Sequence, residues 1–221
     1  MNIRRYRLIA SGIFVFFATL GTACASASSD FFAALARNDA ASVKQMLDAG
    51  FDANAKDGDG EPALLLAVRD KADAVARVLL DAPKLDIDER NRAGETALMM
   101  ACLLGDDALV RTMVEQGAAV DRAGWTPLAY AATHGHTRIA RYLLTHGARV
   151  DAPAPNGTTP LMMAAYFGHL DTVRALLAAG ANPRLRNAMG YRAVDLALRR
   201  EHRAVADALG TAMNPRAPGQ W

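Results

Sequence analysis

A five-residue pattern that recurs about every 33 residues is the feature that most constrains how this chain can fold. Residues 124–128 read Gly-Trp-Thr-Pro-Leu, residues 157–161 read Gly-Thr-Thr-Pro-Leu, and a third copy, Gly-Tyr-Arg-Ala-Val, occupies residues 190–194. Upstream, related copies begin at Gly94 and Gly60. Self-similarity at this interval predicts a row of small, similar units rather than one globular core.

Each unit has the signals of two short helices. Thr126 can cap the first helix and Pro127 suits its first turn, where the missing N–H is not needed. Gly135 offers the left-handed conformation that ends this helix. Apolar residues at helical spacing then mark the second helix, at positions 139, 140, 143 and 144, and Gly147 ends it. The same signals recur 33 residues later.

A single pair of this kind buries an apolar face on one side only, so the pairs must stack into a solenoid. On these motifs the sequence resembles the ankyrin repeat family over about residues 30–210. The resemblance implies an all-α ankyrin-repeat solenoid of helix-turn-helix units joined by short hairpin loops. We expect a signal peptide (1–27), a repeat domain (28–212) and a disordered tail (213–221). Within the domain we expect a partial N-terminal unit (28–56), units at about 57–90, 91–122, 123–153 and 154–186, and a C-terminal capping unit (187–210).

The sequence also departs from the family pattern. The family usually has His after Thr-Pro-Leu, and here that position holds other residues, so its hydrogen bonds are expected to be absent or replaced. These residues are Leu65, Met99, Ala129, Met162 and Asp195. Three residues are missing between Gly117 and Gly124, which predicts a stunted hairpin at that point.

The N-terminal segment has the layout of a secretory signal. Arg4, Arg5 and Arg7 precede an uncharged, mostly apolar run, 8–20, and the small residues GTACASASS. The run is shorter than the roughly 20 residues that a spanning helix needs, so no membrane span is expected. The favoured cleavage is after Ala27, with a cut after Ala25 as the alternative. Two other interpretations are a lipid anchor at Cys24 and twin-arginine export. We expect a periplasmic or secreted protein.

Charge and cysteine content argue against a nucleic-acid-binding protein and against a fold held by disulfides. The chain has 25 basic and 23 acidic residues, and without the three arginines of the signal the formal charge is near −1. This balance gives no support to a nucleic-acid partner. With Cys24 removed or lipidated, only Cys102 remains, so no intramolecular disulfide is expected.

The candidate chemical groups favour structural roles. His136 and His169 occupy a Gly-His position at the start of a second helix, and His146 lies near a helix C-terminus. Cys102 follows Ala101 in a small-residue slot and is expected to be buried. We expect no catalytic residues, no cofactor and no metal.

The resemblance implies a partner-binding face made by the hairpin tips and the exposed edge of the first helices. Its residues here are Arg92, Glu95, Leu103, Leu104, Trp125, Thr133, His134, Thr158, Tyr166, Phe167 and Tyr191. The central ones are apolar, and contiguous apolar surface with Trp and Tyr usually marks an interaction site. A competing interpretation is that the rings and leucines pack against neighbouring units.

We therefore expect a non-enzymatic, monomeric protein-protein interaction module. The favoured role is a periplasmic scaffold or protective partner for another exported protein. The alternatives are an immunity or inhibitor protein against a toxin, and a secreted, host-directed effector.

Overall fold

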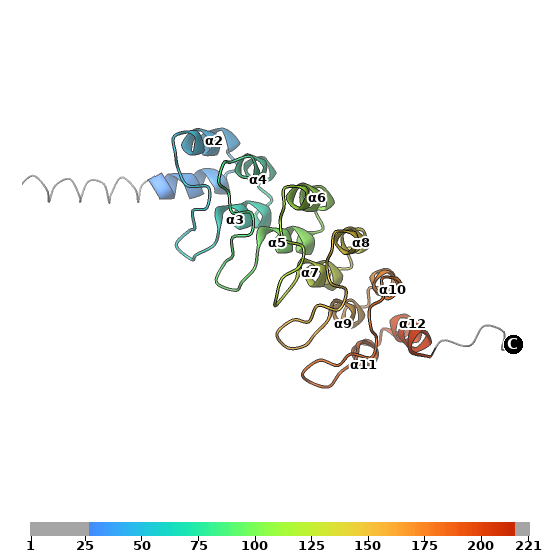
Figure 1. Ribbon diagram of the computed structural model, residues 1–221. Helices are drawn as coiled ribbons and strands as arrows, with labels where there is room; N and C mark the ends of the chain where they lie inside the picture. Colours follow the sequence, from blue (N-terminus) through green and yellow to red (C-terminus); the bar gives the residue numbers. More distant parts are fainter. Residues whose placement is uncertain (1–26, 215–221) are drawn as a thin grey trace, which may run out of the picture.

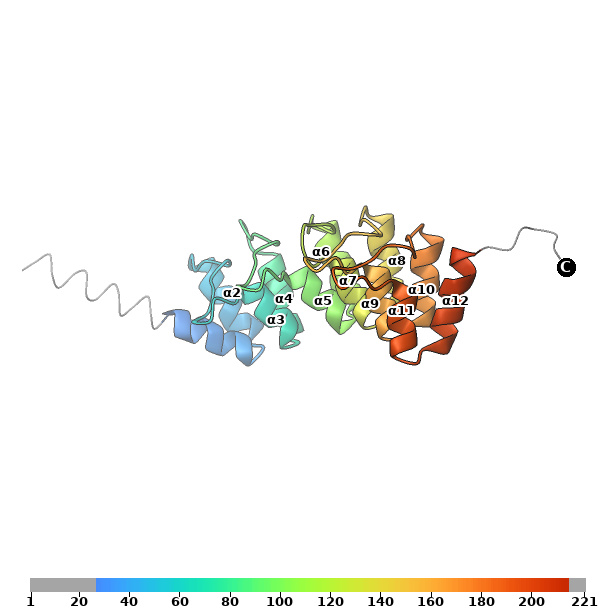
Figure 2. The same ribbon diagram turned by 90° about the horizontal axis from the view of Figure 1, so that it is seen from below.

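The structure, a computed structural model, describes residues 27–214, and these form a stack of six helix pairs (Figure 1). Within this range there is no β-strand, and one isolated bridge joins Lys56 and Pro62. The predicted all-α ankyrin-repeat solenoid is confirmed. Figure 2 shows that the stack is elongated, with the two ends of the described chain at opposite ends of the molecule.

The helices lie in two layers. The inner helices are the first of each pair: residues 27–36, α3 (Ala63–Arg69), α5 (Ala97–Leu104), α7 (Pro127–Thr133), α9 (Pro160–Tyr166) and α11 (Ala193–Arg199). The outer helices are α2 (Ala40–Asp48), α4 (Asp73–Leu80), α6 (Asp107–Glu115), α8 (Thr137–Thr145), α10 (Leu170–Ala178) and α12 (Arg203–Met213). The inner helices from α3 to α11 pack on one another in succession, and the outer helices do so from α2 to α4 and from α6 to α12 (Figure 1).

Threonine caps start the three central inner helices. The Oγ1 atoms of Thr96, Thr126 and Thr159 accept hydrogen bonds from the backbone N–H three residues later, at 3.2–3.3 Å. Each bond satisfies a donor that would otherwise have no partner in the first helical turn. The capping role predicted for Thr126 and Thr159 is therefore confirmed.

Left-handed glycines make the tight turns between inner and outer helices. Gly105, Gly135 and Gly168 have φ of 79°, 73° and 79°. A residue with a side chain adopts this region at a cost, whereas glycine does not. In the first full unit and the last unit the same turn is made by Lys71 (φ 55°) and Glu201 (φ 62°), so the two ends depart from the pattern.

A continuous apolar interior runs through the stack. Its inner-helix part is built from pairs of small residues, among them Ala131-Ala132 and Ala164-Ala165, which are fully buried. Because these side chains end at Cβ, neighbouring inner helices can approach closely. Larger side chains of the outer helices, such as Leu143 and Leu176, fill the space between the layers.

The hairpins that join the units differ in one place. Four are closed by a backbone hydrogen bond near the tip, at 2.9–3.1 Å: Asp57 N–H to Glu61 O, Asn91 to Glu95, Ala154 to Thr158 and Asn187 to Tyr191. Within the fully described segment 118–126 no such bond forms, because three residues are missing there. The predicted stunted hairpin is confirmed.

The bonds that the absent histidine would make are replaced in two units. In α9 the Sδ atom of Met162 accepts the N–H of Thr159 at 3.5 Å, and in α11 the carboxylate of Asp195 accepts the N–H of Arg192 at 2.9 Å. Asp195 also pairs with the Arg192 guanidinium at 2.9 Å, so the last inner helix begins at an ion pair rather than at a threonine cap.

The predictions for the two termini fall largely outside the described residues. The signal segment up to residue 26 and the tail from residue 215 are not described. Helix α12 continues to Met213, so the helix includes the first residue of the predicted tail. Among the described helices none is long and apolar enough to cross a membrane.

Candidate functional site

The last two residues before each inner-to-outer turn occupy equivalent places along one side of the stack. We call these five pairs the inner-helix row. From the first full unit to the last they are Arg69-Asp70, Leu103-Leu104, Thr133-His134, Tyr166-Phe167 and Arg199-Arg200. Because α3, α5, α7, α9 and α11 lie side by side, the pairs form a line across successive units (Figure 1).

The centre of the row is apolar and partly accessible to solvent. Leu104 is 37% exposed and Phe167 is 42% exposed, while Leu103 and Tyr166 are half-buried. The ring of Tyr166 meets that of Phe167 edge to face, with centroids 4.9 Å apart. In each of these two central pairs, one side chain packs partly into the unit and the other is exposed.

Trp125 lies on the stunted hairpin and packs against the neighbouring inner helix. Its ring is half-buried and meets that of Tyr130 edge to face, with a centroid separation of 6.4 Å. This position gives the tryptophan a structural contact and leaves part of the indole accessible. A partly accessible tryptophan is a residue type that protein interfaces favour as an anchor.

The carboxylate of Glu95 is already engaged within the protein. It accepts a 2.6 Å hydrogen bond from the hydroxyl of Tyr130 and a 2.9 Å bond from the side-chain amide of Asn91. Burial, and then the neighbouring Glu95 carboxylate, raise the pKa of the Tyr130 phenol above its ordinary value. Glu95 thus fastens its hairpin to α7, a role that the sequence interpretation missed.

Thr158 does not belong to the accessible face. It is only 6% exposed, because the residue follows the hairpin tip and turns into the stack, where its backbone carbonyl closes the hairpin. This corrects its place in the expected set. Thr133 is half-buried, and its hydroxyl donates to the Ala129 carbonyl at 2.8 Å. Arg92 is exposed, with its side chain over Gly60.

Three histidines, His136, His169 and His202, make contacts between adjacent units. The Nε2–H of His136 donates to the Leu103 carbonyl at 3.0 Å, and that of His169 donates to the Thr133 carbonyl at 2.9 Å. Each ring lies over the left-handed glycine of the preceding turn, and the ring of His202 lies over Gly168 in the same way. His202 is therefore partly buried.

His134 is exposed at the end of α7, in the centre of the inner-helix row. Burial of the ring, and then the proximity of His136 and His169, lower its pKa below the ordinary value. Near neutral pH the side chain is therefore uncharged, which suits the apolar pairs on either side.

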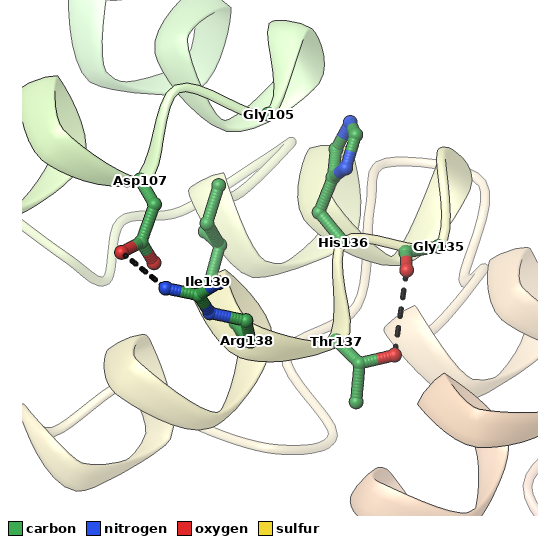
Figure 3. Close-up of a pocket in the computed structure, with 7 residues that line it drawn as sticks. All are labelled: Gly105, Asp107, Gly135, His136, Thr137, Arg138 and Ile139. Atoms are coloured by element: carbon green, nitrogen blue, oxygen red, sulfur yellow. Dashed lines mark hydrogen bonds and ion pairs between the residues drawn. The ribbon is translucent and has the colours of Figure 1, made fainter.

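A pocket of about 350 Å³ lies between the α5–α6 and α7–α8 turns (Figure 3). Gly105 and Asp107 line one side of it, and residues 135–139 line the other. The Asp107 carboxylate pairs with Arg111 at 3.0 Å and with Arg138 at 3.4 Å, and the His136 ring faces Gly105. The Asp107–Arg138 pair and the contact of His136 with Gly105 join adjacent units, so we assign the pocket a structural role.

No group of three or more His, Cys, Asp or Glu side chains that could hold a metal ion is found among residues 27–214. Cys102 is fully buried, as predicted, and burial raises the pKa of its thiol far above the ordinary value. A thiol in this state is a poor nucleophile.

Known proteins share these features. Family models described as "Ankyrin repeats (3 copies)" match residues 31–122 and 84–154, and one described as "Ankyrin repeats (many copies)" matches residues 143–197. Neurogenic locus notch homolog protein 2 from Homo sapiens and from Mus musculus are each 38% identical over 85 residues, which is 38% of this chain. The match spans about 3% of the length of these relatives.

Proposed function

The chain belongs to the ankyrin repeat family, and from this premise we propose that it is a non-enzymatic module that binds another protein through the inner-helix row and the adjoining hairpins. Repeats of this family are in general protein-protein interaction modules. What such a module binds is set by the side chains at its surface and not by its fold.

One observation carries the choice of surface. Leu104 and Phe167 are among the few large apolar side chains that are exposed within residues 27–214, and they hold the same place on two inner helices. Between them on α7 stands His134, which is uncharged near neutral pH for the reasons given above. An exposed apolar line of this kind is costly in water and marks an interaction site.

The test is affinity capture of partners with single variants of the chain. Phe167→Ala and Trp125→Ala are expected to reduce capture at least tenfold, because truncation of a central aromatic anchor costs about 2 kcal/mol or more. Leu198→Ala is the matched control. Leu198 is 58% exposed on α11, at the position that the buried residues Ala132 and Ala165 hold in α7 and α9, and it lies outside the inner-helix row.

Circular dichroism melting curves establish that each variant is folded. If folded Phe167→Ala and Trp125→Ala capture a partner as well as Leu198→Ala and the parent do, the surface is wrongly assigned.

We further propose that the module works outside the cytoplasm, in the periplasm or beyond the cell, as a scaffold or protective partner. Support comes from the basic, apolar and small-residue segments in residues 1–27. Expression with and without this segment, followed by cell fractionation, tests the proposal. Equal retention of both forms in the cytoplasm would contradict it.

A further inference from the structure

We propose that the partner presents an acidic segment with an apolar anchor, and that Arg199 and Arg200, at the last unit of the stack, receive its carboxylates. This inference deepens the proposed function and rests on it. It is carried by the charge distribution along the solenoid and by the contacts of these two arginines.

Formal charge is divided unevenly along the stack. Residues 28–122 contain 18 acidic and 11 basic side chains, a formal charge of −7 with histidine neutral. Residues 123–214 contain 5 acidic and 10 basic side chains, a formal charge of +5. The near-neutral total therefore conceals a negative first half and a positive second half, and the positive end is the end that attracts carboxylates.

The two ends of the inner-helix row, on the proposed binding face, differ in charge in the same way. In the first full unit the pair is Arg69-Asp70, and the Arg69 guanidinium lies 3.1 Å from Asp70 and 3.7 Å from Glu61. In the last unit the equivalent pair is Arg199-Arg200, and within the described part of the chain neither has a carboxylate partner within 4 Å. One end of the row is internally neutralised, and the other is not.

The two arginines are held against aromatic rings of the same face. The Cζ atom of Arg200 lies 4.6 Å from the centroid of Tyr166, and that of Arg199 lies 4.9 Å from the centroid of Tyr191. A guanidinium over a ring keeps the N–H groups at its edge free for hydrogen bonding, and its restricted motion lowers the entropic cost of binding. Such an arginine suits bidentate recognition of a carboxylate.

The position of Phe167 indicates which residue type accompanies the acidic side chains in the bound segment. Phe167 is exposed and touches Tyr166, the ring beneath Arg200. An occupant whose acidic side chains reach Arg199 and Arg200 therefore places a neighbouring residue over Phe167. An apolar or aromatic residue is complementary there. A nucleic acid is disfavoured, because its phosphates would extend towards the half with a charge of −7.

The experiment uses the full chain and a phage-displayed library of random 12-residue peptides. We expect enrichment of peptides with at least two Asp or Glu and one aromatic or large aliphatic residue. Enriched peptides are resynthesised with a fluorophore, and their affinity is measured by fluorescence anisotropy. Each is compared with a version in which Gln replaces every Glu and Asn replaces every Asp.

The neutral versions are expected to bind at least tenfold more weakly, and binding of the acidic versions is expected to weaken several-fold between 50 and 500 mM NaCl. The double variant Arg199→Gln/Arg200→Gln is expected to lose at least tenfold in affinity. The matched control is Arg141→Gln/Arg203→Gln, which removes the same charge from exposed positions on the outer helices and is expected to bind as the parent does.

Several results would overturn the inference. Enriched peptides that are neutral or basic would do so, as would no enrichment, or equal losses in the two double variants. A fluorescent 12-residue oligothymidylate that binds as tightly as the acidic peptides, and also depends on Arg199 and Arg200, would indicate a general polyanion site instead. Apolar peptides that depend on Phe167 but not on the arginines would leave the proposed function intact and remove only the acidic partner.

Discussion

Substitution of Gly135 by alanine separates two physical effects that the repeat structure combines at one position. The residue has φ of 73°, and a Cβ atom there would lie 2.6 Å from Nδ1 of His169. Gly147 has φ of 94°, but a Cβ atom there would meet nothing within 4 Å. Both variants strain the backbone, and only the first also displaces a histidine ring.

The expected magnitudes follow from these contacts. The left-handed conformation costs alanine about 1–2 kcal/mol, and the lower entropy of the unfolded chain offsets about 0.4–1 kcal/mol of this. Gly147→Ala is therefore expected to lose about 1 kcal/mol. In Gly135→Ala the ring must also leave the Thr133 carbonyl, which accepts its 2.9 Å hydrogen bond. Leaving a partly buried acceptor unpaired adds about 1–3 kcal/mol, for a total of about 2–4 kcal/mol.

The assay is urea denaturation followed by circular dichroism, with His169→Ala and the double variant Gly135→Ala/His169→Ala completing a double-mutant cycle. Once the ring is gone, the additional cost of Gly135→Ala should fall to about that of Gly147→Ala. If Gly135→Ala and Gly147→Ala lose the same free energy of unfolding, or if removal of His169 changes nothing, the ring does not make the contact described and the reasoning is refuted.

Three further predictions concern other contacts of the stack. Thr126→Ala is expected to lower the free energy of unfolding by about 1 kcal/mol through loss of the α7 cap, as measured by urea denaturation, and an unchanged value would contradict the cap. The hydrogen bond from Arg192 is the largest of the effects that hold the pKa of Asp195 below its ordinary value. The ion pair therefore contributes its full stability above about pH 4, the ordinary pKa of an unfolded Asp, and this stability is lost as the pH falls through the lower pKa of the folded state. The difference in urea midpoint between the parent and Asp195→Asn should accordingly shrink from pH 7 to pH 3, and a constant difference would count against the ion pair. Cys102 is expected to react with a thiol reagent such as dithionitrobenzoate only at the rate of unfolding, and fast labelling of the folded protein would show that its burial is not maintained.

The local features of the fold are predictable from sequence because their causes lie within one unit. The Thr126 cap and the left-handed Gly135 need only a few neighbouring residues, and both were identified from the repeat pattern. The burial of Cys102 follows in the same way, since the equivalent residues of the next two units, Ala132 and Ala165, are also small and buried.

Contacts between units were harder to predict. Tyr130 and Glu95 are 35 residues apart, and Arg200 and Tyr166 are 34 apart, close to one repeat length. The repeat register brings such positions together, but it does not specify which rotamers meet. The burial of Thr158 had the same origin, because the direction of a side chain at a hairpin shoulder depends on how the loop folds back. Spacing near one repeat between an aromatic and a charged residue is the signal that would have pointed to these pairs.

Arg199 and Arg200 lie in the last unit of the stack, so binding of a ligand to them is expected to depend on how stably this unit is folded. Within residues 27–214 a unit inside the stack packs on two neighbours, whereas the α11–α12 pair packs on one, so its amide hydrogens should exchange with solvent faster than those of α5 or α7. A bound acidic segment that contacts α11 through these arginines would restrain this pair and slow amide exchange in α11 and α12 more than in the units that already pack on two neighbours. Part of the binding free energy would then be used to order the end of the stack. Substitutions that stabilise the packing of α12 on α11, without touching the arginines, should therefore strengthen binding without any new contact to the ligand.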